Sequence, residues 1–341
     1  MRTRLWTLCI VGLLCLAGCR PEKVAEAIPG PEESTYTVGA EKGTSTKTRR
    51  FQFRYRFKVS GVESGKQVRA WLPVPPSNEH QTITASDHQL PTAPTFHADE
   101  KYGNRILFVE AMVPESGSLS FDVPYEVVRH EILASNESKT NDAQPGELFL
   151  AANSKVPLEG KPLELLSDLS LSDDPFQKAN QLYEVVDKHV TYNKDGKGWG
   201  NGDVLWVCDS GRGNCTDFHS LFISLARSQG IASRFEIGFP IPTDAKEGSV
   251  GGYHCWAFFF DASRGWVPVD ISEADKHPEL KEYYFGGLTA DRVMFSVGRD
   301  IELVPKSTEK SLNYFVYPHL EVDGQKVSRD QIELQFSYTD L

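Results

Sequence analysis

Two features are scarce in this 341-residue sequence: long apolar stretches and an excess of positive charge. Beyond the N-terminus no run reaches the roughly 18 apolar residues that a membrane-spanning helix needs, which excludes a bundle of such helices. Lys and Arg number 36 against 47 Asp and Glu, which gives a formal net charge of −11. Such a surface repels phosphate groups over most of its area. We therefore expect no nucleic-acid partner.

Cysteine is also scarce, and its six occurrences fall into two sets. Three lie in the first 19 residues, and the body of the chain has Cys208, Cys215 and Cys255. Three thiols form at most one disulfide, which excludes a disulfide-rich scaffold and leaves at least one thiol as a candidate reactive group. A Cys208–Cys255 disulfide in an oxidising exterior stays open.

The N-terminus has the pattern of a secretory signal. Two arginines precede an apolar run over residues 5–16, which is too short to span a bilayer comfortably, and small residues follow. Leu16-Ala17-Gly18-Cys19 resembles the bacterial lipobox, which implies that residues 1–19 are a lipoprotein signal peptide and that Cys19 is acylated. We expect an exported protein, lipid-anchored to the bacterial cell envelope at Cys19 and facing the periplasm or the exterior.

Composition divides the rest of the chain into four segments. Residues 20–48 are rich in Pro, Glu, Lys and Thr with little apolar surface, which is typical of a disordered tether. Over residues 49–131, aromatic and charged residues alternate at first, and turn-forming residues separate further apolar runs. This pattern predicts short strands and an all-β sandwich. We interpret residues 132–172 as a connector and residues 173–341 as a catalytic domain with both helices and strands.

A Gly-Asn turn places Cys215 at the start of an apolar helix. Phe218, Leu221, Phe222 and Leu225 recur at helical spacing after it, so one helix face is expected to be buried. Unpaired N–H groups and the positive end of the helix dipole stabilise an anion in the first turn, which lowers the pKa of a thiol there. Cys215 is therefore the candidate nucleophile, although a cysteine on an apolar helix also fits an inert packing role.

A cysteine nucleophile needs a base and a group that holds the base. Two strands, at residues 253–260 and 266–271, are joined by a short turn and are predicted to form a hairpin. His254 opens the first strand and Asp270 closes the second, so antiparallel pairing brings the two side chains together. We expect the helix of Cys215 to pack on this hairpin, with His254 as the base and Asp270 as its partner.

Three segments resemble the transglutaminase-like family and occur in the family's order. Gly213-Asn214-Cys215, with residues 225–234 and Gly238, is similar to the nucleophile segment; residues 254–257 (His-Cys-Trp-Ala) resemble the histidine strand, and residues 265–270 (Gly-Trp-Val-Pro-Val-Asp) the aspartate strand. The match covers roughly residues 150–290, and the preceding β domain is similar to the N-terminal module of bacterial members. The resemblance implies an α+β fold: a papain-like transglutaminase core with a Cys215–His254–Asp270 triad, preceded by an all-β immunoglobulin-like sandwich.

The resemblance also bears on activity. Some members cross-link glutamine to amines, others hydrolyse amide bonds and some have lost activity, so a protein or peptide is the implied substrate. Peptide hydrolysis fits an exported enzyme better, and we favour a protease or amidase over an acyltransferase. In transglutaminases a tryptophan upstream of the cysteine stabilises the oxyanion, which makes Trp206 or Trp199 the candidate here. Nothing resembles the calcium sites of the animal enzymes, and we expect no cofactor or metal.

Three alternatives stand beside this interpretation. A non-catalytic transglutaminase-like binding module at the cell envelope would keep the fold without turnover. Zinc binding by the cysteines and histidines is the second, although their spacings do not match a finger or a knuckle. The third concerns the base: His219 lies one turn beyond Cys215, but its place on the core face favours a packed histidine.

Overall fold

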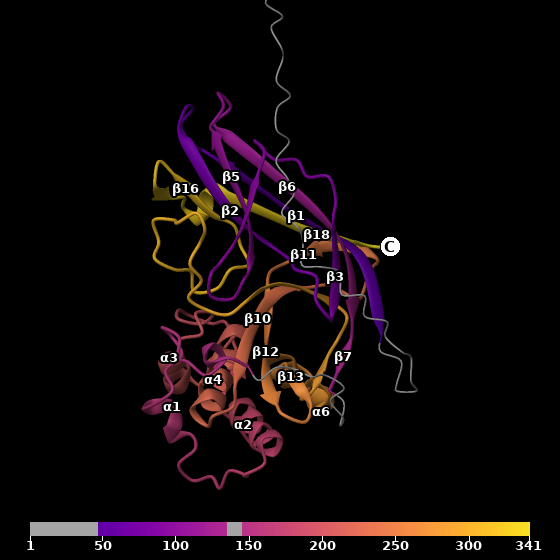
Figure 1. The fold of residues 1–341 in the computed structure, drawn as a ribbon, viewed down its shortest axis with the longest axis vertical. Helices are drawn as coiled ribbons and strands as arrows, with labels where there is room; N and C mark the ends of the chain where they lie inside the picture. Colours follow the sequence, from indigo (N-terminus) through magenta and orange to yellow (C-terminus); the bar gives the residue numbers. More distant parts are fainter. Residues whose placement is uncertain (1–46, 135–144) are drawn as a thin grey trace, which may run out of the picture. The chain divides into compact units, whose positions relative to one another are not determined.

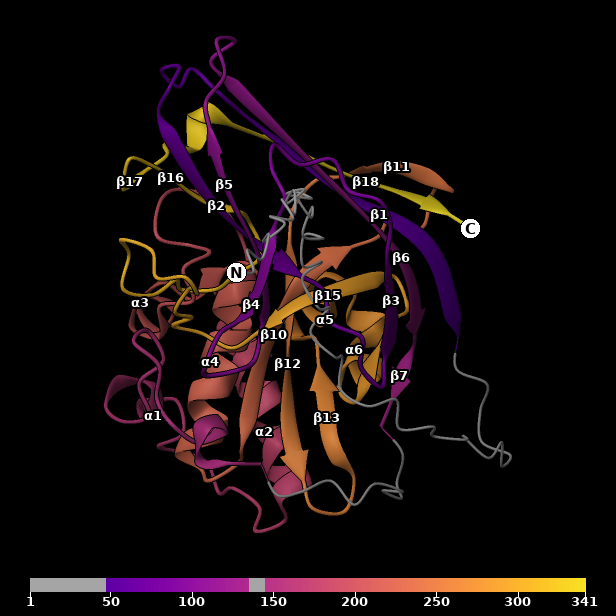
Figure 2. The same ribbon diagram turned by 45° about the horizontal axis from the view of Figure 1, so that its top comes forward.

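The computed structural model describes residues 47–134 and 145–341 (Figures 1 and 2). The signal peptide, Cys19 and residues 20–46 of the tether lie outside the described residues, so the predictions made for them stay predictions. In the part of the chain that the structure describes, no helix combines the length and the apolar character needed to cross a membrane.

The first sheet of the sandwich is antiparallel, with the strand order β11-β18-β1-β6-β3. Its strands are β1 (Thr48–Ser60), β3 (Gln81–Ala85), β6 (Ser118–His130), β11 (Glu247–Val250) and β18 (Ile332–Asp340). The alternating sequence of β1 buries its aromatic residues on one face and turns its cations towards solvent on the other. Phe57 of β1 stacks on Phe121 of β6, with the ring centroids 4.3 Å apart.

The second sheet has the order β17-β16-β2-β5-β4. Its strands are β2 (Gln67–Val74), β4 (Thr95–Ala98), β5 (Arg105–Met112), β16 (His319–Val322) and β17 (Gln325–Lys326). Buried side chains of both sheets, such as Phe57 and Val109, belong to one hydrophobic core. The two sheets thus form the layers of the expected sandwich.

The structure differs from the sequence-based division in one respect. β11, β16, β17 and β18 lie within residues 173–341 yet pair with strands of the sandwich (Figure 1). β18 pairs with β1 from Phe51↔Asp340 to Val59↔Ile332, and β16 pairs with β2. Without them β1 and β2 would present unpaired N–H and C=O groups at an edge, which the end of the chain satisfies. The sandwich is therefore built from both ends of the described chain.

The part of the chain expected to be catalytic, called the catalytic part below, has its own antiparallel sheet, in the order β13-β12-β10-β15. Its strands are β10 (Ser233–Pro240), β12 (His254–Asp261), β13 (Gly265–Val269) and β15 (Arg292–Val297). The helices are α1 (Lys161–Glu164), α2 (Pro175–His189), α3 (Val204–Ser210), α4 (Cys215–Ser228), α5 (Ile271–Lys276) and α6 (Lys281–Tyr284). Two short pairings join β8 (Thr191–Tyr192) to β9 (Arg212–Gly213), and β7 (Ile132–Leu133) to β14 (Gly287–Leu288). Three-residue 3-10 helices span Glu147–Phe149, Pro278–Leu280 and Arg329–Gln331.

Helix α4 is the centre of this part of the molecule. Every residue in it except Ser228 is buried, because α2, α3 and α5 pack around it and β10 and β12 lie against it (Figure 2). A helix enclosed on all sides has to satisfy any polar group it carries within the protein. The polar residues of α4 therefore indicate where the fold is built for something other than packing.

Candidate active site

Cys215 is the first residue of α4, as the sequence predicts. Asn214 caps the helix in an extended conformation (φ −109°), and its Oδ1 accepts a hydrogen bond from the Thr216 N–H at 2.9 Å. Asp217 accepts the Asn214 N–H at 2.9 Å, which completes a capping box. The Cys215 side chain is 2% exposed, and its own N–H belongs to the helix turn that has no acceptors inside the helix.

His254 and Asp270 meet as the hairpin argument requires. β12 and β13 pair antiparallel from Ala257↔Val269 to Asp261↔Gly265, so the start of one strand lies beside the end of the other. His254 Nε2 lies 2.8 Å from Asp270 Oδ2, and both residues are buried. The Cys215 thiol lies near enough to His254 that each group shifts the pKa of the other. The structure therefore brings the three predicted site residues together at the N-terminal end of α4.

The charges of these groups follow from their contacts. Burial alone would raise the pKa of the Cys215 thiol, but hydrogen bonds with Cys255 and His254, and the charge of His254, hold it well below its usual value. Burial would lower the pKa of His254, whereas Asp270 and Cys215 raise it to about 10. The pKa of Asp270 is held far below its usual range, because its cationic neighbours outweigh the effect of burial. The arrangement favours a thiolate–imidazolium pair beside a permanent carboxylate.

His219 is close to the same groups but differs in charge. Its Nε2 accepts a hydrogen bond from the Ile271 N–H at 3.1 Å, and its Nδ1 lies 3.7 Å from Cys255 Sγ. Burial lowers its pKa to about 4. A neutral ring whose Nε2 accepts a backbone N–H serves as a packed histidine, and His254 is the better-placed base.

A glycine-rich loop, residues 194–202, is tied to the first turn of α4. The buried carboxylate of Asp217 accepts N–H groups of Gly200 at 2.6 Å and of Gly202 at 2.9 Å, besides that of Asn214. Gly202 has a φ of +55°, and a side chain there would overlap Ser220. The attachment of the loop to Asp217 could not be predicted from the sequence, because the loop and helix meet only in the folded chain.

Tyr253 joins the His254 strand to the Cys215 helix. Its hydroxyl accepts from Asn214 Nδ2 at 3.0 Å and lies 2.9 Å from Thr216 Oγ1. The rings of Tyr314 and Tyr317 pack against it, at centroid distances of 5.4 and 5.8 Å. These contacts fix the spacing between the two elements that carry the thiol and the imidazole.

Both candidate tryptophans for the oxyanion role lie in or against the glycine-rich loop. Trp199 Nε1 donates to the Gly196 carbonyl at 3.2 Å, and the Trp206 indole lies against Gly198. Among the contacts of the described residues, none joins either indole to Cys215. An oxyanion role for Trp206 stays a prediction.

None of the three cysteines in the described residues forms a disulfide. Cys208, Cys215 and Cys255 are free in the structure, so the Cys208–Cys255 disulfide is not formed. Cys255 Sγ is buried 3.8 Å from Thr216 Oγ1, whereas Cys208 is half-buried on α3. Residues 47–134 and 145–341 contain no group of three or more His, Cys, Asp or Glu side chains arranged to hold a metal ion.

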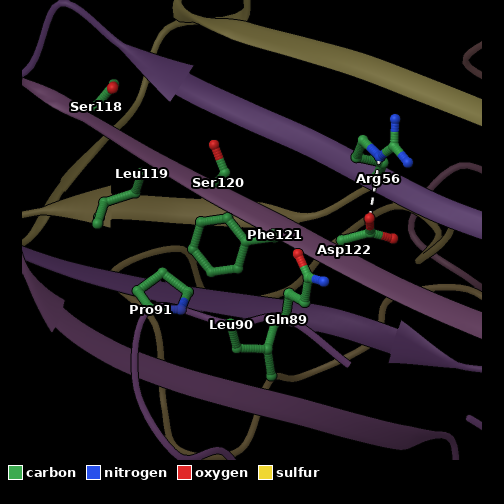
Figure 3. A pocket seen from close by; sticks show the side chains of 9 residues that line it. All are labelled: Arg56, Gln89, Leu90, Pro91, Ser118, Leu119, Ser120, Phe121 and Asp122. Carbon is green, nitrogen blue, oxygen red and sulfur yellow. Dashed lines mark hydrogen bonds and ion pairs between the residues drawn. The ribbon is translucent and has the colours of Figure 1, made fainter. Parts of the chain in front are cut away.

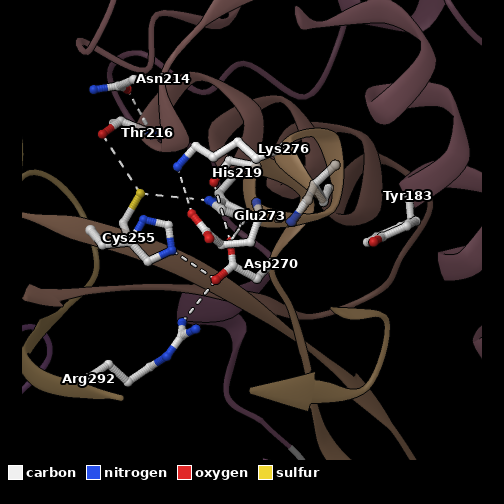
Figure 4. A network of polar contacts seen from close by, with 12 residues as sticks. Tyr183, Asn214, Thr216, His219, Cys255, Asp270, Glu273, Lys276 and Arg292 are labelled. Carbon is white, nitrogen blue, oxygen red and sulfur yellow. Dashed lines mark hydrogen bonds and ion pairs between the residues drawn. The ribbon is translucent and has the colours of Figure 1, made fainter. Parts of the chain in front are cut away.

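One site residue was missed by the sequence argument. Arg292 Nη1 donates to Asp270 Oδ2 at 2.9 Å, from β15 at the opposite edge of the sheet from β13 (Figure 4). No local pattern marks an arginine at the start of a strand as part of a site, because its partner is brought to it by the fold.

A separate pocket of about 440 Å³ lies on the sandwich beside Arg56, Phe121 and Asp122, and it shares no residue with this site (Figure 3).

This fold and the buried thiol, imidazole and carboxylate at the end of one helix define a cysteine-protease-like α+β protein. Its backbone matches the crystal structure of a proposed cysteine protease from Cytophaga hutchinsonii with a TM-score of 0.54, over 87% of this chain and 99% of that chain at 12% identity. Residues 165–271 match the model of the transglutaminase-like superfamily, and this part of the chain has a transglutaminase-like core.

Two further similarities are more distant or carry no assigned function. A protein of unassigned function from Haemophilus influenzae is 26% identical over 315 residues, which span 80% of this chain and 85% of that protein. The periplasmic domain of TgpA from Pseudomonas aeruginosa matches with a TM-score of 0.35, over 72% of this chain and 99% of that chain at 14% identity.

Proposed function

We propose that this chain is an exported cysteine amidase or protease that cleaves amide bonds of proteins or peptides through a thioester on Cys215. The observation that carries the proposal is the contact of His254 with Asp270 at 2.8 Å, on a ring whose pKa is raised by the nearby Cys215 thiol at a helix N-terminus. A protein that only binds a ligand has no need of this combination of groups.

The reaction has two halves. The Cys215 thiolate attacks the carbonyl carbon of the amide, and the Cys215 N–H at the start of α4 is placed to donate to the oxyanion. The His254 imidazolium gives its proton to the leaving amine as the C–N bond breaks, which leaves a thioester and neutral imidazole. A water molecule, deprotonated by His254, then attacks the thioester; the C–S bond breaks, the carboxylic acid is released and the thiolate–imidazolium pair is restored. Asp270 holds the ring in orientation throughout.

Hydrolysis and transfer to an amine differ only in the second half of the reaction. We favour hydrolysis, because an amine competes with water only where the site excludes water and binds the amine. The test gives the purified protein a glutamine-containing peptide with and without a fluorescent primary amine. Cleaved peptide is the expected product, and a fluorescent peptide without cleavage would identify a transglutaminase instead.

The control variants for this assay are Cys215→Ala and Cys208→Ala. We expect the first to be inactive and the second to be active, since the half-buried Cys208 lies outside the site and burial raises the pKa of its thiol to about 11. If wild type and Cys215→Ala are equally inert and iodoacetamide does not label Cys215 of the wild type, the protein is a binding module of this family.

The cellular location is proposed from the N-terminal leader. Cleavage before Cys19 and acylation of its thiol and amine would anchor the mature chain to the bacterial cell envelope. Mass spectrometry of the protein from membranes is expected to find the acyl chains on Cys19. A mature chain without acyl groups in the soluble fraction would contradict the anchor but not the export.

A further inference from the structure

One carboxylate oxygen at the site is shared by two cationic side chains. Asp270 Oδ2 lies 2.8 Å from His254 Nε2 and 2.9 Å from Arg292 Nη1. Both Asp270 and Arg292 are almost fully buried, at 0% and 4% exposure. Removing an arginine side chain from water is energetically costly. Its burial here therefore indicates that the guanidinium has a role inside the protein.

Arg292 is held in this place by its surroundings. Its guanidinium lies 4.8 Å from the ring centroid of Trp256, which is two residues beyond His254 on β12. A cation over an aromatic face is stabilised by the ring quadrupole. The contact sets the position of the guanidinium relative to the strand that carries the imidazole.

The neighbouring strand brings Arg292 close through a glycine. β15 pairs with β10 with a register shift at Ile237 and Gly238, and Pro240 faces Arg292. A side chain on Gly238 would lie 1.8 Å from the Val293 carbonyl oxygen, so only glycine permits this approach. The sequence thus keeps β15 near enough for Arg292 to reach Asp270.

We propose that Arg292 is a positioning residue of the catalytic apparatus, which fixes the Asp270 carboxylate and limits how tightly it holds the proton of His254. This inference rests on the proposed function of Cys215, His254 and Asp270. Arg292 does not touch the thiol or the substrate in this scheme and acts only through Asp270.

The orienting effect follows from the hydrogen bonds of the carboxylate. The other oxygen, Oδ1, accepts from Ser272 Oγ at 3.3 Å and from the Glu273 N–H at 3.4 Å, both of which are long. Arg292 therefore supplies the short contact that opposes rotation of the carboxylate away from His254. Without it we expect the His254 ring to lose its fixed orientation.

The electrostatic effect follows from the charges around the pair. A second cation on the same oxygen disfavours the imidazolium, and a His254 that holds its proton less tightly is a better acid towards the leaving amine. Other titratable or charged groups near His254, Asp270 or Arg292 come from six elements. They are Tyr183 of α2, Cys215 and His219 of α4, Glu273 and Lys276 of α5, Tyr283 and Tyr284 of α6, Arg129 of β6 and Cys255 of β12. Of the described residues, only Arg292, His254 and His219 bring a nitrogen within 4.0 Å of the Asp270 carboxylate as ion-pair partners.

The test compares Arg292→Gln with Arg292→Lys in the full chain. Ring-nitrogen NMR of labelled histidine follows the protonation of His254, with His254→Gln used to assign its signals. We expect the pH at which His254 loses its proton to rise by about one unit or more in Arg292→Gln, and to change less in Arg292→Lys, which keeps the charge. In the peptide assay we expect kcat of Arg292→Gln to fall about tenfold or more with little change in KM.

The outcomes separate the two proposals. If wild type cleaves peptide and Arg292→Gln lowers thermal stability but leaves the His254 titration and kcat unchanged, Arg292 is a structural residue and this inference is wrong. If wild type is inert in the peptide assay, the proposed function fails first, whatever the titration gives. If Arg292→Gln does not fold, the Lys variant answers the same question. A kcat below that of wild type with an unchanged KM supports the positioning role, because an ammonium group cannot reproduce the geometry of the guanidinium. A kcat and a His254 titration that both equal those of wild type overturn it.

Discussion

The outer face of the sandwich and the site around Asp270 place charged residues in opposite environments. In the sandwich, Arg54 pairs with Asp122 at 2.7 Å on the outer face, where the arginine side chain is 40% exposed. In the catalytic part, Asp270, His254 and Arg292 are all buried beneath other side chains. A surface pair is screened by water and contributes little, whereas a buried charge is tolerated only if every partner is in place. The charged residues of the site therefore carry a larger desolvation cost than the Arg54–Asp122 pair does.

The largest effect is expected from removing the nucleophile. Cys215→Ala should abolish peptide cleavage while the protein stays folded, because alanine replaces a small buried side chain. Turnover by the wild type and Cys208→Ala is the reference measurement. Equal cleavage by wild type and Cys215→Ala would show that another group performs the reaction.

The comparison is sharpened by the same substitution in the two regions. Asp270→Asn should lower kcat by about 10²- to 10⁴-fold, because the amide cannot stabilise the imidazolium. Asp122→Asn in the sandwich should leave kcat unchanged and lower the free energy of unfolding by about 1 kcal/mol or less. Steady-state kinetics and urea unfolding of both variants decide the matter, and a comparable loss of kcat in the two would remove the distinction.

Asp217 offers a test of a buried carboxylate outside the triad. Asp217→Asn leaves some of its three N–H donors without a good acceptor, and we expect a loss of about 2 kcal/mol in the free energy of unfolding. Faster proteolysis within residues 194–202 should accompany it, since the loop loses its attachment. The matched control is Asp174→Asn at the N-cap of α2, where the carboxylate accepts one hydrogen bond, from the Gln177 N–H. An unchanged loop in Asp217→Asn would contradict the anchoring role.

The two buried histidines should give stability opposite pH dependences. The folded pKa of His254, about 10, lies above the unfolded value of about 6.5, so its contribution is present below pH ~6.5 and is lost as pH rises towards 10. The folded pKa of His219, about 4, lies below the unfolded value of about 6.5, so stability is lost as pH falls from ~6.5 towards 4. Urea unfolding across this range should therefore show a maximum near neutral pH.

Single variants assign the two limbs of that profile. His254→Gln should flatten the alkaline limb and His219→Gln the acid limb, each relative to wild type. A profile that keeps both limbs in both variants would mean that other groups control the pH dependence.

The smallest effect is expected at the outer face of β1. Arg50 pairs with Glu126 at 2.6 Å, but its side chain is 56% exposed. Arg50→Ala should change the free energy of unfolding by about 0.5 kcal/mol or less, and added salt should reduce the difference further. A loss of several kcal/mol would mean that surface charge matters as much in the sandwich as buried charge does in the catalytic part.

Much of the site could be predicted because its signals are local. The cap, the apolar spacing after Cys215 and the turn between two short strands each lie within a few residues, and local geometry then brings His254 to Asp270. The strands of residues 49–131 were predictable for the same reason. The attachment of β16 and β18 to the sandwich was not predictable, because no local pattern in their sequence identifies a pairing strand so distant in the chain.

The sequence by itself determined that Cys215 begins a helix and that His254 and Asp270 meet, since backbone periodicity and a tight turn specify their places. Only the tertiary structure decided that Arg292 shares Asp270 with His254, that Asp217 holds the glycine-rich loop and that His219 is neutral. Each of these depends on which side chains exclude water from one another and on strands that meet across the fold. Charge state and partner choice are properties of that packing, and a linear pattern does not contain them.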